Sequence, residues 1–302
     1  MSMKSSPSQS DFTPLEKWEE TFVPPSYSRP SIFKRFQSHL LGIAGMLLFL
    51  GIVILTILGP LISGYSPETT HLTLKNHPPS SQFWFGTDDL GRDLFTRVWF
   101  GARISLCIGF LAASIDLIVG LIWGGIAGFS GGKIDEAMMR FVDILYALPY
   151  LLIVILFTVV LGSGFFSIVL AITLFGWITM ARIVRGQILL IKEMDYILAE
   201  KVLGASFSRI LWKHLLPNAS GPILVTLTLT IPSAIFSEAF LSFLGLGVQA
   251  PTASWGTMAH EGLPALQYYP WRLFFPAFLI SLTMLSLHWI GEGLKSAFDK
   301  TE

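Results

Sequence analysis

Long apolar segments alternate with short polar ones along most of the chain. A helix needs about 20 mostly apolar residues to cross a bilayer, because lipid offers the backbone polar groups no other hydrogen-bond partner. Six segments approach this length, the fourth and the sixth being short: Leu40–Ile62, Ile104–Ala127, Phe141–Leu161, Phe165–Ala181, Gly221–Leu246 and Leu273–Ile290. The pattern predicts an all-α membrane protein with six transmembrane helices.

The composition agrees with this fold class. Of the 302 residues, 52% are hydrophobic and 13% are charged, whereas soluble domains carry roughly 25% charged residues. The formal net charge is zero, so no overall basic field favours binding to nucleic acid. The single cysteine, Cys107, excludes a disulfide within the chain and a cysteine-rich metal site.

The distribution of Lys and Arg predicts the orientation, since cytoplasmic loops carry an excess of these residues. With the N-terminus inside, 15 of the 20 lie in inner segments, so we expect both termini in the cytoplasm. Residues 1–39 are expected to form a cytoplasmic tail, and residues 40–302 the membrane domain. Apolar and basic residues alternate at the end of the tail and suit a helix at the membrane interface: Ile32, Phe33, Lys34, Arg35 and Phe36.

Ionisable residues at membrane depth are functional candidates by default. Asp143 and His288 lie near the inner ends of their spans, where water or headgroups solvate them, which favours a structural role. Asp116 lies in the middle of a span and Glu238 near the outer end of another. These two acids are therefore our candidates for a translocation pathway.

Glycine and proline positions predict how the spans pack. Gly120, Gly124 and Gly128 follow one another at four-residue spacing, so one helix face lacks side chains and allows close approach of another backbone. That backbone belongs either to another span of this chain or to a partner subunit. Pro149 and Pro232 each remove a backbone donor inside a span, so kinks are expected there.

Motifs for catalysis are absent from the sequence. His260-Glu261 resembles the start of a zinc-protease motif, but Pro264 stands where the second histidine is required. No segment has the spacing of a phosphate-binding P-loop. We therefore expect no catalytic residue, no metal site and no cofactor on this chain, and any ATP must bind elsewhere.

Two polar segments remain. Phe85–Asp93 is dense in turn formers and opposite charges, which suits either a loop fixed by its own polar contacts or a docking surface. The cytoplasmic segment 182–218 predicts a helix over Tyr196–Leu203 that ends at Gly204, then a second helix from Ser206 to Leu216 with a bend at Pro217. On physical grounds alone, such an element is also compatible with a position on the membrane surface.

A resemblance to a known protein family favours one interpretation of this cytoplasmic segment. Ala199, Gly204 and Leu216-Pro217 match, without gaps, the "EAA" signature of ABC importer permeases. Several further motifs, in the correct order, resemble the dipeptide/oligopeptide permease subfamily: Gly86–Asp93, Gly101–Ser105, Arg140–Ile144, Leu241–Gly247, Ser254–Gly256 and Gly291–Leu294. The resemblance covers roughly residues 35 to 300 and implies the type I importer permease fold in a bacterial plasma (inner) membrane.

The resemblance also implies partners. The chain would be the second of two homologous permeases that together form a translocation path in membrane lipid for a peptide. Two ATP-binding subunits would carry ATP and Mg²⁺, and an extracytoplasmic solute-binding protein would deliver the substrate. By position, the outer contact with that protein would involve Asp88, Arg92 and Asp93.

The same resemblance makes segment 182–218 the coupling loop, which inserts into a groove on an ATP-binding subunit. The coupling residues would be Ala199, Glu200, Gly204, Ala205 and Pro217. One departure is visible: Leu198 stands where the family has glutamate, and Glu200 replaces the second alanine.

Two other classes of protein compete with this interpretation. A secondary transporter would use Asp116 and Glu238 as proton or ion sites, but no inverted repeat is evident. A membrane-embedded enzyme would need paired acids or metal ligands, which do not stand out. The sequence does not select among dipeptides, oligopeptides, glutathione, nickel complexes and antimicrobial peptides as substrates. His71 and His77 beside Pro78 suit ordinary loop histidines better than nickel ligands.

Overall fold

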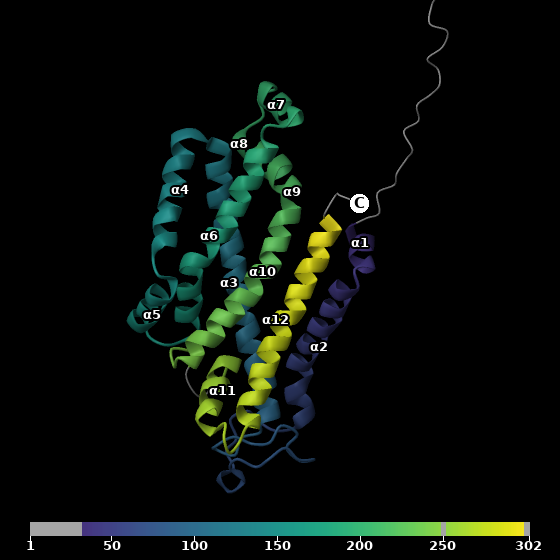
Figure 1. Ribbon diagram of the computed structural model, residues 1–302, viewed down its shortest axis with the longest axis vertical. Helices are drawn as coiled ribbons and strands as arrows, with labels where there is room; N and C mark the ends of the chain where they lie inside the picture. The colour runs from purple at the N-terminus through teal and green to yellow at the C-terminus, as the bar shows by residue number, and fades with distance from the viewer. Residues whose placement is uncertain (1–31, 249–251, 299–302) are drawn as a thin grey trace, which may run out of the picture. The chain divides into compact units, whose positions relative to one another are not determined.

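The computed structural model describes residues 32–248 and 252–298, and α-helices make up most of them (Figure 1). Most of the predicted tail lies outside the described residues. Its end forms the short helix α1 (Ile32–Ser38), where the interfacial helix was expected. Within the described ranges, the only β pairing is an isolated bridge between Thr87 and Asp93.

Five helices are long and apolar enough to cross a membrane. They are α2 (Leu40–Ser63), α3 (Leu94–Ser130), α6 (Phe165–Ile191), α10 (Ser220–Phe243) and α12 (Trp271–Phe298). The sixth predicted crossing consists of two helices, α4 (Gly132–Ala147) and α5 (Tyr150–Leu161), bent by 83° relative to each other.

The span predicted over Phe141–Leu161, with a kink at Pro149, is thus divided into two helices. Proline disfavours the helical conformation for the residue before it and lacks an N–H of its own. Leu148 accordingly adopts an extended conformation with φ −75° and ψ 142°, and Pro149 begins the second helix. The kink expected at Pro149 is a complete break, whereas α10 continues through Pro232.

Several helices extend beyond their apolar segments. α3 begins at Leu94 rather than Ile104, because the Asp93 carboxylate caps it by accepting a hydrogen bond from the Thr96 N–H at 2.8 Å. α6 continues to Ile191, so the first ten residues of segment 182–218 are helix rather than loop. Hydropathy reports only the part of a helix that lies in lipid, and these helices project past it.

Short helices occupy both ends of the bundle. At the end assigned to the cytoplasm lie α7 (Asp195–Val202), α8 (Phe207–Ile210), a π turn (Leu211–Leu215) and α9 (Leu216–Asn218). The start of α2 and the end of α12 lie at this same end (Figure 1). The outer end carries α11 (Trp255–Gly262) and the loop 64–93, with 3₁₀ turns at Leu72–Leu74 and Leu263–Ala265.

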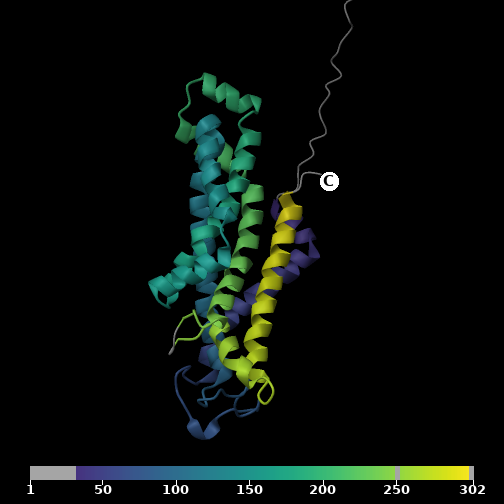
Figure 2. The same ribbon diagram turned by 60° about the vertical axis from the view of Figure 1, so that its left-hand side comes forward.

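The glycine face of α3 packs against α6 in the same chain. A side chain at Gly120 would collide with Met180, and one at Gly124 or Gly128 with the α6 backbone. The close approach predicted from the glycine spacing is thus intramolecular. On the other side of the molecule, α2 packs along α12, and α12 along α10 (Figure 2).

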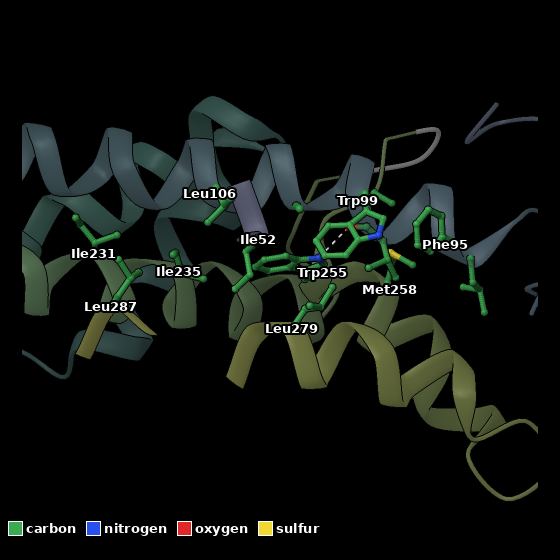
Figure 3. Close-up of a cluster of buried hydrophobic side chains, with 14 of the residues drawn as sticks. Ile52, Phe95, Trp99, Leu106, Ile231, Ile235, Trp255, Met258, Leu279 and Leu287 are labelled. Atoms are coloured by element: carbon green, nitrogen blue, oxygen red, sulfur yellow. Dashed lines mark hydrogen bonds between the residues drawn. The ribbon is translucent and has the colours of Figure 1, made fainter. Parts of the chain in front are cut away.

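A buried cluster that extends from the outer end into the middle of the bundle joins α2, α3, α10, α11 and α12 (Figure 3). Its centre is Trp255, whose side chain is fully buried and donates a hydrogen bond from Nε1 to the Val98 carbonyl at 2.9 Å. The sequence placed residue 255 in a loop. Its burial fixes α11 against the end of the bundle.

Candidate functional site

Helix α7 ends in a glycine turn at the apex of the cytoplasmic segment. Leu203 donates a backbone hydrogen bond to the Ala199 carbonyl at 3.0 Å, and Ala205 donates one to the Glu200 carbonyl at 3.0 Å. Gly204 has φ +81°, in the left-handed region that glycine adopts without strain. The helix, turn, helix prediction is confirmed here.

The second half of the element differs from the prediction. Ser206 caps α8 through its Oγ, but the helical path passes through Pro217 into α10 instead of stopping there. The π turn lies directly before the proline, with the Leu216 N–H bonded to the Leu211 carbonyl. A π turn is wider than an α turn and accommodates a proline ring that an α-helix interior would reject.

One face of this element is anchored to the bundle. Buried side chains from α7, α8 and the π turn form a cluster with the inner end of α6: Ile188, Ile191, Ile197, Ile210, Leu211 and Leu215. The rings of Phe129 and Phe207 add an edge contact, with centroids 4.6 Å apart. This packing joins the element to α6 and α10.

The opposite face is exposed and apolar. Val202 and Leu203 are 88% and 82% exposed, and no atom lies within 4 Å of the place where a Gly204 side chain would begin. Two apolar side chains at the tip of a projecting element are costly to leave in water. This apex is the strongest candidate contact surface at the cytoplasmic end.

Glu200 faces inward rather than toward the apex. Its Oε1 lies 3.6 Å from the Nε2 of His214 in the π turn. Leu198, at the position where the family has glutamate, is instead partly exposed. The acid of this chain thus links the two halves of the element to each other.

At the outer end, the Asp88 carboxylate is the centre of a buried ionic network. It accepts hydrogen bonds from the backbone N–H groups of Leu90 and Arg92 at 2.9 Å and from Arg92 Nε at 2.6 Å. Arg97 pairs with the same carboxylate and, through Nη2, with Glu261 of α11 at 3.2 Å. Burial alone would raise the pKa of Asp88, but the two guanidinium groups and the N–H donors outweigh it and lower that pKa.

Arg92 and Asp93 are buried as well. Asp93 caps α3, and burial raises the pKa of its carboxyl despite the hydrogen bonds from Thr96. Asp88, Arg92 and Asp93 therefore lie inside the protein, which matches the fixed-loop alternative. Direct contact of these three side chains with another protein stays a prediction; in this structure they shape the loop from within.

The two intramembrane acids lie in different surroundings. Glu238 is fully buried, and its carboxylate accepts hydrogen bonds from Ser105 and Ser242, both at 2.8 Å. Asp116 lines a cavity of about 810 Å³ between α3, the α4/α5 bend, α6 and α10. Of the two acids, Asp116 borders a space large enough for a solute.

Some residues of both sites escaped sequence reasoning. Arg97, Glu261 and Arg272 fix the outer loop, and the charge of Arg97 at the start of an apolar helix was the available signal. Asp143 pairs with Arg182 at 2.8 Å, and Asp135 with Arg185 at 2.5 Å, which ties α4 to α6. In the part of the chain that the structure describes, no group of three or more His, Cys, Asp or Glu side chains could hold a metal ion.

Comparison with protein families gives two matches. Residues 120–300 match the binding-protein-dependent transport system inner membrane component family. Residues 31–79 match the N-terminal transmembrane domain of oligopeptide transport permease C. The first match includes α6, α10, α12 and the whole cytoplasmic element.

Curated relatives extend over nearly the whole chain. The oligopeptide transport system permease protein OppC of Bacillus subtilis is 58% identical over 265 residues, which are 88% of this chain and 87% of the relative. The dipeptide transport system permease protein DppC of the same species is 53% identical over 281 residues, or 91% and 88% of the two chains. OppC of Escherichia coli K12 is 39% identical over 268 residues, or 88% and 89%.

Among solved structures, the MetNI methionine ABC transporter in an inward-facing conformation shares the fold. The TM-score is 0.55 at 18% sequence identity, and the match covers 65% of this chain and 94% of the other. The family lies in the bacterial inner membrane, which agrees with the five spans and the bent pair. The chain therefore belongs to the inner-membrane permease family of binding-protein-dependent ABC importers, on the oligopeptide and dipeptide permease branch, and is a transport subunit rather than an enzyme.

Proposed function

We propose that this chain is one of two homologous permease subunits of a peptide importer. Two ATP-binding subunits would bind one permease each, and the apex around Val202, Leu203 and Gly204 is the contact on this chain. The observation that carries the proposal is the exposure of this apolar apex on an element whose other face is buried. Peptide as substrate is supported by the oligopeptide and dipeptide permeases among its relatives.

The anchoring of the element supports a coupling role. Closure of the ATP-binding subunits displaces the apex, and the buried cluster passes that displacement to α6 and α10. Packed interiors transmit such movements because they deform little. ATP binding would thus favour the outward-open state, and hydrolysis would return the bundle to the inward-open one.

The remaining partners follow from the same proposal. An extracytoplasmic solute-binding protein would dock on the outer surface built by loop 64–93 and α11, which the Asp88 network holds together. ATP and Mg²⁺ would be bound by the partner subunits, and this chain would bind no cofactor. Ala199, Glu200, Ala205 and Pro217 would shape the coupling element rather than form its contact face.

The test is a charge placed at the apex. Leu203→Asp should lower ATP-driven peptide uptake at least tenfold in proteoliposomes that contain the whole importer, and should reduce co-purification of the ATP-binding subunits. The matched control is Ile134→Asp, since Ile134 is an exposed apolar residue at the same end, on α4. Normal uptake and assembly in Leu203→Asp, or an equal loss in both variants, would contradict the proposal.

A further inference from the structure

The cavity beside Asp116 has the features of a binding site. Its volume of about 810 Å³ falls in the range of small-molecule sites, roughly 300–1,000 Å³. Five helices contribute to its wall, including α4 and α5 on the two sides of their break. Hydroxyl groups line it together with apolar side chains: Tyr146, Tyr150, Thr179, Thr226, Thr230, Ser233 and Ser237.

The Asp116 carboxylate is buried but incompletely bonded. The residue is 1% exposed, and its Oδ1 has no hydrogen-bond partner among the described residues. Space for the carboxylate exists only because residue 176 on α6 is glycine: a side chain at Gly176 would collide with the Asp116 oxygens. The protein therefore fixes the Asp116 carboxylate in place without supplying a hydrogen-bond donor to its Oδ1.

The hydroxyls around the cavity do not supply the missing partner. Thr226, Thr230 and Ser233 each donate to a carbonyl four residues earlier in α10, at 2.8, 2.9 and 3.0 Å. Tyr150 donates to Ser237 Oγ at 3.3 Å. Their free lone pairs add further acceptors, so the wall offers more acceptors than donors.

Among the described residues, the lining of the cavity contains a carboxyl group and no basic side chain. Asp116 supplies the one carboxyl group of this described wall, and no Lys, Arg or His is present there. A cationic group is the complement of a carboxylate surrounded by hydroxyl acceptors, whereas an anion would be repelled. A charged acid at membrane depth is also expensive to keep, which favours a functional reason for it.

We propose that the Asp116 carboxylate binds an ammonium group of the peptide as it passes through the cavity. This inference rests on the proposed function, because it takes a peptide as the solute. The ammonium group belongs either to the peptide's amino terminus or to a lysine side chain. Asp116 is then a substrate-binding residue of the translocation path, and Gly176 is the positioning residue that makes room for it.

The first experiment measures the charge preference of the cavity without transport. Ser233 lines the cavity and is exposed, so a Ser233→Cys reporter is introduced into the whole importer in a Cys107→Ser background. The reaction rates of a cationic and an anionic methanethiosulfonate reagent are compared. Asp116→Asn should lower the cationic-to-anionic rate ratio roughly tenfold, as expected for one charge a few ångströms away in a partly dry site.

The matched reporter is Ser81→Cys in the outer loop, which is exposed and distant from the cavity wall. Its rate ratio should not change with Asp116→Asn. An unchanged ratio at residue 233, or no reaction there with either reagent in any nucleotide state, would overturn the proposal. Neither outcome bears on whether the importer carries peptides.

The second experiment measures selectivity. Uptake is compared among three peptides of one sequence: free amino terminus, acetylated amino terminus, and acetylated amino terminus with one lysine. Each peptide is used at equal occupancy of the solute-binding protein. Asp116→Asn should lower uptake of the amine-bearing peptides about tenfold and leave the fully blocked peptide unaffected, with activity restored by Asp116→Glu.

The three peptides distinguish the two sources of the ammonium group. Loss with the free amino terminus alone identifies the backbone amine, and loss with the lysine peptide as well identifies any ammonium. An equal loss for all three peptides would indicate a structural role and overturn the proposal. If the unmodified importer shows no ATP-driven uptake of any peptide, the proposed function fails, while the labelling result still decides the charge preference.

Discussion

The carboxylate of Glu200 and the imidazole of His214 lie 3.6 Å apart, across the space between α7 and the π turn. Both side chains are partly buried, and the contact links the two halves of the coupling element. An acid committed to this internal link is not placed to reach the groove of an ATP-binding subunit. The effect of losing the Glu200–His214 contact must therefore be measured separately from the effect of losing the proposed contact with an ATP-binding subunit.

Replacing Glu200 tests that separation. Glu200→Gln should cost less than about 1 kcal/mol of stability, the usual value for a partly exposed ion pair, and should keep peptide uptake within about twofold. Uptake in proteoliposomes and thermal unfolding are the measurements. A tenfold loss of uptake at normal stability would instead place Glu200 in the contact with the ATP-binding subunit.

The Asp88 network predicts an acid-sensitive outer loop. The pKa of Asp88 is lowered from 3.8 in the folded protein. Its stabilising contribution is therefore complete above that pH and is lost as the pH falls through the folded-state pKa. The raised pKa of Asp93 acts in the opposite direction, since protonation of that buried carboxyl favours the folded state.

Asp88→Asn should remove the part of the loop's stability that is lost when Asp88 is protonated at low pH. It should also destabilise the loop at neutral pH. It leaves Arg97 buried beside a neutral group, and breaking a buried ion pair costs roughly 3–5 kcal/mol. Proteolysis of loop 64–93 from about pH 2 to 8, with an acid-active protease below pH 4, reports both effects. Asp89→Asn is the control, because Asp89 is exposed and its partner Arg272 keeps hydrogen bonds to Asn76 and to the Glu261 carbonyl. Equal protease sensitivity of the two variants would contradict this account.

Gly204 is required for its backbone conformation and not for space. Its φ of +81° penalises a residue with a side chain by about 1–2 kcal/mol, although nothing lies near enough to collide. Gly204→Ala should lower thermal stability by that amount, and Gly204→Asn by less, because asparagine tolerates this region. Gly186→Ala, on a helix with open space around it, should be neutral or stabilising. Equal stability of the two alanine variants would contradict the backbone explanation.

Gly124 is required for the opposite reason. It lies in a helix, but an added side chain would meet the Ala181 carbonyl and Val184 of α6. Gly124→Ala should therefore destabilise the α3–α6 contact by roughly 1–3 kcal/mol, the usual cost of overpacking. Thermal unfolding of the purified importer, again with Gly186→Ala as reference, is the measurement. A neutral result would show that the two helices separate easily.

The sequence identified the spans well where composition alone determines them. The predicted Leu40–Ile62 and the observed α2 differ by one residue, because both ends of the helix coincide with the ends of the apolar run. The starts and ends that depend on capping were missed, as at Asp93, since a helix that projects into water has no hydropathy signal. A kink at Pro149 was predicted, but the angle of the bend depends on the tertiary contacts that hold α4 and α5.

Among the site residues too, features set by the local sequence were predicted, and features that depend on residues distant in the sequence were not. The cytoplasmic helix, turn, helix element follows from local chemistry, namely a glycine, a serine cap and apolar spacing, and its outline was predicted. The burial of Asp88 and Arg92 depends on Arg97 and Glu261, which lie far away in sequence from one another. The cavity beside Asp116 is formed by five separate helices, so no single stretch of sequence contains it.

The 83° bend between α4 and α5 has a consequence for the surrounding lipid. With a rise of 1.5 Å per residue, the 12 residues of α5 reach about 18 Å, well short of a hydrocarbon core of about 30 Å. α4, with 16 residues, also falls short on its own. Acyl chains beside this elbow must either thin the bilayer or give way to another protein. Hydrophobic mismatch thus lowers the cost of displacing lipid from this flank of the bundle.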